Sequence, residues 1–166
     1  MDITIRAARP DDLDRVSYIE NTCFPAAEAA TYDSLKERLA AFKHSFLVAE
    51  KDGQVIGMVN GCVTHKRQLV DELYDSTQLH DDTAPYQMIF GLDVLPEYQH
   101  QGIAAKLMRA YEQLARRRDK ELITLTCKKR LVPFYEQLGY KFEGESVSTH
   151  GGVTWYDMTL FLKQTP

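Results

Sequence analysis

One segment of the chain has the residue order of an anion-binding turn. A run of apolar residues ending at Val94 predicts a strand, and a helical pattern begins after Gly102, so a loop joins the two. The amides of a helix's first turn have no partner within the helix, and the helix dipole places partial positive charge beside them. Because Gly102 and Ala104 carry little or no side chain, a phosphate could approach these amides closely. The segment predicts a phosphate-binding turn, although one glycine between a strand and a helix is often only a turn.

Two other phosphate-binding motifs are missing from the sequence. There is no glycine-rich loop followed by Lys-Ser or Lys-Thr, and no fingerprint of three spaced glycines. The sequence therefore disfavours nucleoside triphosphates and nicotinamide cofactors as ligands.

Two motifs in the C-terminal half resemble those of GNAT acetyltransferases. Residues 99–104, Gln-His-Gln-Gly-Ile-Ala, resemble the acetyl-CoA signature of that family, Gln/Arg-x-x-Gly-x-Gly/Ala. Residues 131–140, Leu-Val-Pro-Phe-Tyr-Glu-Gln-Leu-Gly-Tyr, resemble the segment of serotonin (arylalkylamine) N-acetyltransferases that holds their catalytic tyrosine. Upstream, the resemblance consists of the order of elements and of Phe24 between the first two helices.

The resemblance implies a place for acetyl-CoA. The pantetheine arm would pair like an added strand with the backbone of Leu92 and Val94, and the pyrophosphate would lie on residues 101–104. In this family the two central strands splay apart after the signature strand, and the thioester lies in that opening near Tyr135. The residues implied to contact the cofactor are Leu92, Asp93, Val94, Gln99, His100, Gln101, Gly102, Ile103, Ala104 and Ala105.

Tyr135 is implied to be the catalytic acid. Attack of an amine on the thioester expels a coenzyme A thiolate, which a phenol held nearby can protonate. A free phenol has a pKa of about 10 and a thiol one of about 8.5, so the transfer is uphill unless the site stabilises phenolate or the proton moves late. The alternative is a core tyrosine that packs beside Phe134.

The attacking amine must lose a proton, and a base is harder to find. Serotonin acetyltransferases have two histidines on the signature strand, where this chain has Met88 and Phe90, which weakens any argument for serotonin as the substrate. Glu28 lies in the connector that lines the acceptor pocket in the family, and we predict it to be the base. A solvated loop carboxylate is the competing interpretation, and Glu20 and Asp93 are the other candidates.

Aromatic side chains are implied to enclose the acceptor. Phe24 and Trp155 fall where the arylalkylamine enzymes place phenylalanines on either side of the substrate. Apolar walls with one acidic group, here Glu28, suit an aromatic or alkyl amine. Ordinary core packing is the alternative for both rings.

Other reactive side chains receive no site role. Cys127 has no adjacent histidine to activate it, so a covalent acetyl-cysteine route is not expected. The five histidines show no ligand spacing, so we predict no metal site. The basic runs at 116–118 and 128–130 are typical of solvated helix ends and loops.

The hydrophobic pattern predicts the elements that position these motifs. The expected order is β-α-α-β-β-β-α-β-α-β-β, with a polar surface excursion over 66–85. With the resemblance, it predicts an α/β fold: a GNAT-like mixed, mostly antiparallel sheet of about seven strands flanked by helices, with splayed central strands. The predicted elements are a strand at Ile3 and Ile5, helices near 13–19 and from Thr31, a hairpin of 45–50 and 55–64, a helical piece at 69–74, a strand over 88–94, a helix over 102–119, a strand over 122–127, a helix over 132–138, and strands near 141–147 and 154–162.

Length and composition set the wider limits. The 166 residues fit one domain, 1–166, and a formal charge of −4 gives no field for holding nucleic acid. The three cysteines lack the paired spacing of a zinc site or disulfide framework. The N-terminus lacks a signal design, and no run approaches the roughly 20 apolar residues that span a bilayer. We therefore expect a cytoplasmic protein with no membrane partner.

These observations predict an acetyl-CoA-dependent N-acetyltransferase, in which a primary amine attacks the thioester directly. The acceptor would be a small molecule, such as an arylalkylamine, or a peptide, and the protein a monomer or homodimer. A peptide-lysine or N-terminal acetyltransferase is one alternative, and a non-catalytic acyl-CoA-binding module is another. Tyr135 argues against the second alternative.

Overall fold

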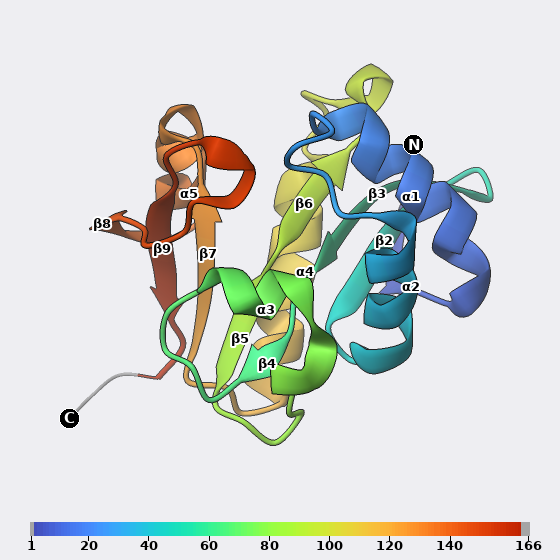
Figure 1. Ribbon diagram of the computed structural model, residues 1–166. Coiled ribbons are helices and arrows are strands. Elements are labelled where there is room, and N and C mark those ends of the chain that lie inside the picture. The colour runs from blue at the N-terminus through green and yellow to red at the C-terminus, as the bar shows by residue number, and fades with distance from the viewer. Residues whose placement is uncertain (1, 164–166) are drawn as a thin grey trace.

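Helices cover both faces of two neighbouring sheets (Figure 1). The computed structural model describes residues 2–163. Within this range the strand orders are β1-β2-β3-β6 and β4-β5-β7-β9-β8. The β5–β7 pair is parallel, and the other pairs are antiparallel. The main elements are β1 (Ile3–Ala7), α1 (Leu13–Cys23), α2 (Tyr32–Ala41), β2 (Phe46–Lys51), β3 (Gln54–Asn60), β4 (Val63–Thr64), α3 (Asp71–Asp75), β5 (Tyr86–Ile89), β6 (Gly91–Val94), α4 (Ile103–Arg117), β7 (Leu122–Cys127), α5 (Val132–Gln137), β8 (Lys141–Glu145) and β9 (Tyr156–Phe161).

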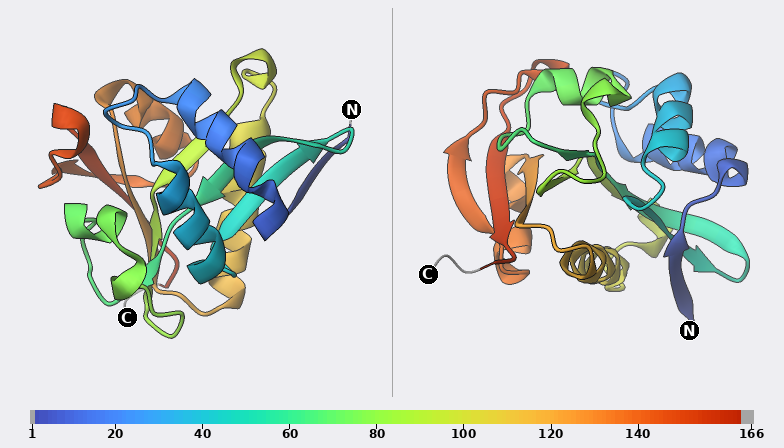
Figure 2. Two further views of the ribbon diagram at one scale, coloured as in Figure 1. Left: turned by 45° about the vertical axis from the view of Figure 1, so that its right-hand side comes forward. Right: turned by 90° about the horizontal axis from the view of Figure 1, so that it is seen from below.

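The helices pack through the apolar faces that their sequences predict. In α4 the buried residues recur every three or four positions, as in an amphipathic helix. Helices α4 and α5 lie on one side of the sheets, and α1, α2 and α3 lie on the other (Figure 2). One apolar core forms on each side. The predicted α/β class with flanking helices is confirmed.

The β2–β3 hairpin has the turn that its Asp-Gly pair predicts. Asp52 and Gly53 both have positive φ, at 52° and 79°. Lys51 pairs with Gln54 across them, so the connection is the two-residue turn favoured by the twist of antiparallel strands. The predicted hairpin is confirmed.

Two strands that the sequence predicts as continuous are interrupted where the sheets separate. Residues 55–64 divide into β3 and β4, and residues 88–94 divide at Phe90 into β5 and β6. A Cβ on Gly61 would lie 1.9 Å from the carbonyl oxygen of Met88, so two backbones meet at this point. Among the described strands, β6 pairs with β3 alone, whereas β5 pairs with β4 and β7. The predicted splay is present, and it leaves one edge of β6 open.

The segment between β4 and β5 is a surface excursion only in part. Leu69 and Ala84 are fully buried, and Leu73 is 2% exposed. Leu69 and Leu73 belong to the core shared with α1 and α2. The prediction of a surface segment is therefore wrong for the buried residues. Leu69 and Leu73 are four positions apart, so they place apolar area on one side of an otherwise polar stretch.

Candidate active site

The turn before α4 has free amides directed away from the helix. Gly102 is the N-cap residue of α4, with φ of 80°, and no side chain caps the helix start. A Cβ on Gly102 would meet no described atom within 4 Å, so the space above the turn is open. The first turn of α4 has no acidic residue, so the positive end of the helix dipole is not neutralised locally. This geometry fits a phosphate group, as the sequence predicts.

The open edge of β6 is where the sequence places the pantetheine arm. The amide of Leu95 donates to the carbonyl of Ile56 in β3, at 3.0 Å. Since backbone directions alternate along an antiparallel strand, the backbones of Leu92 and Val94 face the open edge. The carbonyl of Val94 already accepts hydrogen bonds from Gln99 Nε2, at 3.0 Å, and from Cys23 Sγ, at 3.3 Å. The backbone groups of Leu92 are therefore more available than those of Val94 for pairing with a pantetheine arm.

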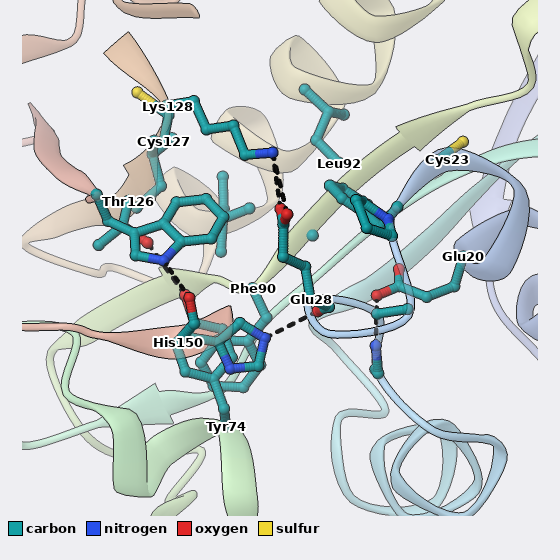
Figure 3. Close-up of a pocket in the computed structure, with 18 of the residues that line it drawn as sticks. Glu20, Cys23, Glu28, Tyr74, Phe90, Leu92, Thr126, Cys127, Lys128 and His150 are labelled. Carbon is teal, nitrogen blue, oxygen red and sulfur yellow. Dashed lines mark hydrogen bonds and ion pairs between the residues drawn. The ribbon is translucent and has the colours of Figure 1, made fainter. Parts of the chain in front are cut away.

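A cavity of about 350 Å³ fills the opening between β6 and β7. Its walls come from α1, the connector after it, α2, α3, the end of β5, β6, β7, α5 and the loop before β9, and Figure 3 shows many of the lining side chains. Five residues predicted for the site line it together: Phe24, Glu28, Leu92, Tyr135 and Trp155. The predicted cofactor residues 99–105 lie in the turn and first turn of α4, beyond the end of β6. The structure thus brings the acceptor and acid candidates into one cavity.

Tyr135 contributes a phenol to the cavity from the short helix α5. It is 7% exposed, and its ring packs edge-on against Phe134 and Tyr140, with centroids 5.0 Å and 6.0 Å away. Within residues 2–163, no group hydrogen-bonds the Tyr135 hydroxyl. Burial raises the pKa of Tyr135, so the hydroxyl keeps its proton at neutral pH.

Glu28 is held by a cation from the opposite wall. Its Oε1 and Oε2 lie 2.9 Å and 3.1 Å from Lys128 Nζ, at the end of β7. The carbonyl of Glu28 accepts a hydrogen bond from His150 Nε2, at 2.8 Å. Figure 3 shows Glu28 and Lys128 pointing toward each other across the cavity. Glu28 therefore links the connector after α1 to the end of β7 and to the loop before β9.

A second carboxyl group, that of Glu20 in α1, also lines the cavity. Glu20 is 5% exposed, and its Oε2 accepts a hydrogen bond from the amide of Ala30, at 2.8 Å. Asp93, predicted as a cofactor contact, is 1% exposed and lies beside Glu20 rather than at the open edge. Arg38 of α2 also lines the cavity and donates to Asn60 Oδ1, at 3.1 Å. A buried cation and two buried acids thus share this region.

Most of the sequence matches a known family. Residues 13–140 match the Acetyltransferase (GNAT) family. The chain belongs to the GNAT acetyltransferase family.

Solved GNAT structures share the fold of this chain over its whole length. The loading GNATL domain of CurA from Lyngbya majuscula superposes with a TM-score of 0.86, at 13% identity, covering 98% of both chains. The protein YncA from Salmonella typhimurium, solved with its cofactor acetyl-CoA, superposes with a TM-score of 0.72, at 19% identity, covering 100% of this chain and 97% of that one. At these identities the likeness establishes the GNAT fold.

A curated relative matches the GNAT chain over part of its own length. The probable hydrolase YhcX of Bacillus subtilis is 25% identical over 122 residues, which cover 69% of this chain. The chain spans 24% of the length of that relative.

The GNAT site contains residues that the sequence did not single out. Tyr74 stacks on His150, with ring centroids 5.1 Å apart, and the indole of Trp155 donates to the carbonyl of His150, at 2.7 Å. Trp155 precedes β9 rather than lying in it. Arg38 had one signal in the sequence, since it lies between Leu35 and Leu39 on the apolar face of α2. His150 had none, because a glycine-rich loop carries it.

Two further observations concern membrane-spanning helices and metal ligands. None of the helices within residues 2–163 is long and apolar enough to cross a bilayer. In the same range, no three His, Cys, Asp or Glu side chains gather as metal ligands would.

Proposed function

We propose that this GNAT protein transfers the acetyl group of acetyl-CoA to a primary amine. The observation that carries the proposal is the position of Tyr135, which lines a cavity at the open edge of β6. Acetyl-CoA would supply the thioester, with its phosphates at the uncapped start of α4 and its pantetheine arm beside Leu92. The amine would enter from the side of the connector at 24–30.

The reaction needs an acid and a base in this cavity. When the amine nitrogen attacks the thioester carbon, the carbonyl oxygen gains negative charge, and the C–S bond breaks as the carbonyl re-forms. Tyr135 donates its proton to the departing thiolate. Glu28 as the base stays a prediction, and its ion pair with Lys128 makes Glu20 a competing candidate.

The walls of the cavity favour an amine with an aromatic or alkyl body. Phe24, Tyr74, Phe90 and Trp155 all line it, and acidic side chains stand beside them. A flat apolar group could pack between such rings while its ammonium group meets a carboxylate. Arylalkylamines are therefore the acceptors that we propose first, and peptide lysines and N-termini come second.

The experiment is a measurement of thiol release with acetyl-CoA and a panel of amines. We expect release with phenethylamine and tyramine, and slower release with lysyl peptides. A reversal of that order would assign the protein to peptide acetylation. Tight acetyl-CoA binding without release for any amine would instead identify a non-catalytic acyl-CoA-binding module and refute the proposal.

A further inference from the structure

Two acidic side chains meet beside Gly91, in the wall of the cavity. A Cβ on Gly91 would lie 3.1 Å from Asp93 Oδ1 and 3.6 Å from Glu20 Oε1, so both carboxyls lie next to the position that a side chain at 91 would occupy. Gly91 and Glu20 both line the cavity. A side chain at 91 would crowd Asp93, so the glycine keeps this contact open. The acids come from α1 and β6, 73 positions apart in sequence, and only the fold brings them together.

The hydrogen bonds around this pair are incomplete. Among residues 2–163, no donor reaches Glu20 Oε1 or either side-chain oxygen of Asp93, and all three atoms are buried. Two ionised carboxylates can only accept hydrogen bonds, so they cannot satisfy each other. If one of them keeps a proton, it can donate to the other, and the buried oxygens gain a partner. The geometry therefore favours one shared proton.

The charges around the pair agree with a single shared proton. Burial raises the pKa of Asp93 well above its ordinary value, and the adjacent Glu20 carboxylate raises it further. Arg38, from α2, is the cation that faces the pair and opposes this rise. The thiol of Cys23 on α1 also faces the pair, and burial raises its pKa to about 12, so it stays neutral. One positive charge on Arg38 thus balances one negative charge on the two acids.

We infer that the Glu20–Asp93 pair accepts the proton of the attacking amine, with Glu20 facing the acceptor and Asp93 holding the shared proton. The inference rests on the proposed amine acetylation. Glu20 is the catalytic residue of the pair because it lines the cavity, and Asp93 acts through it as a positioning residue.

The proton transfers balance over one turnover. The ammonium gives one proton to Glu20 and becomes a neutral amine, whose lone pair forms the N–C bond. The C–S bond breaks, and the thiolate takes the proton of Tyr135. The amide nitrogen returns its second proton to the Tyr135 phenolate. The proton on Glu20 leaves to solvent through the cavity, so the net products are amide, thiol and one proton.

Glu20 suits this work better than Glu28 because of what each carboxylate contacts. Both oxygens of Glu28 lie within 3.1 Å of Lys128 Nζ, and a proton would have to displace that cation. Glu20 forms no ion pair among residues 2–163, and its Oε2 accepts a hydrogen bond from the neutral amide of Ala30. An amine in the cavity can therefore approach the Glu20 carboxylate without displacing a cation.

The test compares two nucleophiles of the same shape that differ in basicity. Phenethylamine is almost wholly protonated at neutral pH and needs a base, whereas O-benzylhydroxylamine is mostly neutral and does not. Glu20→Gln keeps the shape of the side chain and can donate to Asp93. We expect its kcat/KM to fall by about 10²-fold or more for phenethylamine and by less than about 10-fold for O-benzylhydroxylamine. If lysyl peptides prove to be the acceptors, the comparison uses a lysyl peptide and its aminooxy analogue.

Glu28→Gln is the matched comparison, since it makes the same change in the same cavity. We expect it to slow both nucleophiles by a similar factor, because it disturbs the Lys128 contact rather than a proton transfer. A loss selective for phenethylamine in Glu28→Gln, or equal losses for both nucleophiles in Glu20→Gln, would overturn the inference while leaving amine acetylation intact. Wild-type protein that acetylates no nucleophile would refute the proposed function as well.

Infrared spectroscopy tests the shared proton without turnover, which keeps the inference open to refutation if Glu20→Gln does not fold. We expect the wild-type protein at neutral pH to show the carbonyl band of a protonated carboxyl, and Asp93→Asn to lose that band. A wild-type spectrum without the band would rule out the pair as described.

Discussion

At the scale of single residues, the acid in this site is a buried phenol next to a leaving thiolate. Burial raises the pKa of Tyr135, which makes its proton harder to release. The same burial disfavours a coenzyme A thiolate, whose thiol pKa rises above its value of about 8.5 in water. Because burial raises both pKa values, the difference between them need not grow inside the cavity. The proton can then pass from Tyr135 to the sulfur as the C–S bond breaks.

Replacing Tyr135 should slow acetyl transfer without loss of the fold. Tyr135→Phe deletes one hydroxyl from a ring that also packs against Phe134 and Tyr140. Since general acid catalysis contributes about 10²–10⁴-fold, we expect kcat to fall within that range. Steady-state thiol release at saturating acetyl-CoA measures the rate, and calorimetry should show unchanged cofactor affinity.

Tyr140→Phe is the control for this substitution. Tyr140 lies outside the cavity lining, and its buried hydroxyl has no hydrogen-bond partner in the described part of the chain. Its removal should leave the rate unchanged and the fold at least as stable, because an unpaired buried hydroxyl is lost. Equal rates in both variants, or a larger defect in Tyr140→Phe, would overturn the assignment of the acid.

The acid pair predicts a dependence of stability on pH. An acid whose pKa is raised on folding stabilises the native state fully below its unfolded pKa, about 3.9 for Asp, and loses that contribution as pH rises through the folded value. Each unit by which folding raises the pKa of Asp93 is worth about 1.4 kcal/mol. Asp93→Asn mimics the protonated form, so its free energy of unfolding should exceed that of the wild type increasingly above pH of about 4. Urea unfolding across this range measures the difference, and parallel curves for the two proteins would contradict it.

The candidate site was predictable where a residue belongs to a motif. Tyr135 and Leu92 were found in this way, and both line the cavity. Partnerships between distant positions were not predictable. Lys128 meets Glu28 from 100 positions away, and Asp93 has its side chain beside Glu20 although its position suggested a cofactor contact. Such contacts depend on the packing of the completed fold rather than on local pattern.

At the scale of elements, the start of α4 should carry most of the electrostatic binding of the cofactor. Gly102→Glu places bulk and negative charge over the free amides, so acetyl-CoA affinity should fall by about 10-fold or more, given that a charge at a helix end is worth up to about 2 kcal/mol. Gly53→Glu is a close match, because Gly53 has φ of 79° and also has open space around it, in the β2–β3 turn. Calorimetry should show normal affinity for Gly53→Glu. Equal affinities for the two folded variants would exclude this turn as the phosphate site.

The regular elements were predicted well, and the breaks between them were not. The predicted strand over 122–127 coincides with β7, because six consecutive residues with strand propensity precede a basic loop. The interruptions at Gly61 and Phe90 arise because β3 and β5 approach closely, with Gly61 against the carbonyl of Met88. The residue pattern of one strand contains no information about which later strand will pack against it in the fold.

At the scale of the whole molecule, the cavity lies between two halves, one built on the sheet that holds β6 and the other on the sheet that holds β7. The apolar cluster around α4 and α5 and the one around α1 and α2 meet along the sheets. Across the cavity, the contacts of Glu28 with Lys128 and His150 join the halves. A cofactor in the splay would contact β6 of one sheet and approach β7 and α5 beside the other. Its binding energy should therefore stabilise the arrangement of both sheets.

Acetyl-CoA should accordingly raise the melting temperature of the native protein. A ligand that binds only the folded state at 100 times its Kd adds about 2.7 kcal/mol. For a chain of this length each kcal/mol corresponds to about 2–4 °C, so the expected rise is about 5–11 °C. Differential scanning calorimetry with and without acetyl-CoA measures this rise, and desulfo-coenzyme A should give a similar one because it keeps the phosphates and most of the pantetheine arm. Gly53→Glu should keep the ligand-induced rise and Gly102→Glu should lose most of it, whatever their melting temperatures without ligand. A full rise in Gly102→Glu would mean that the adenine or pantetheine contacts, and not the start of α4, supply the affinity.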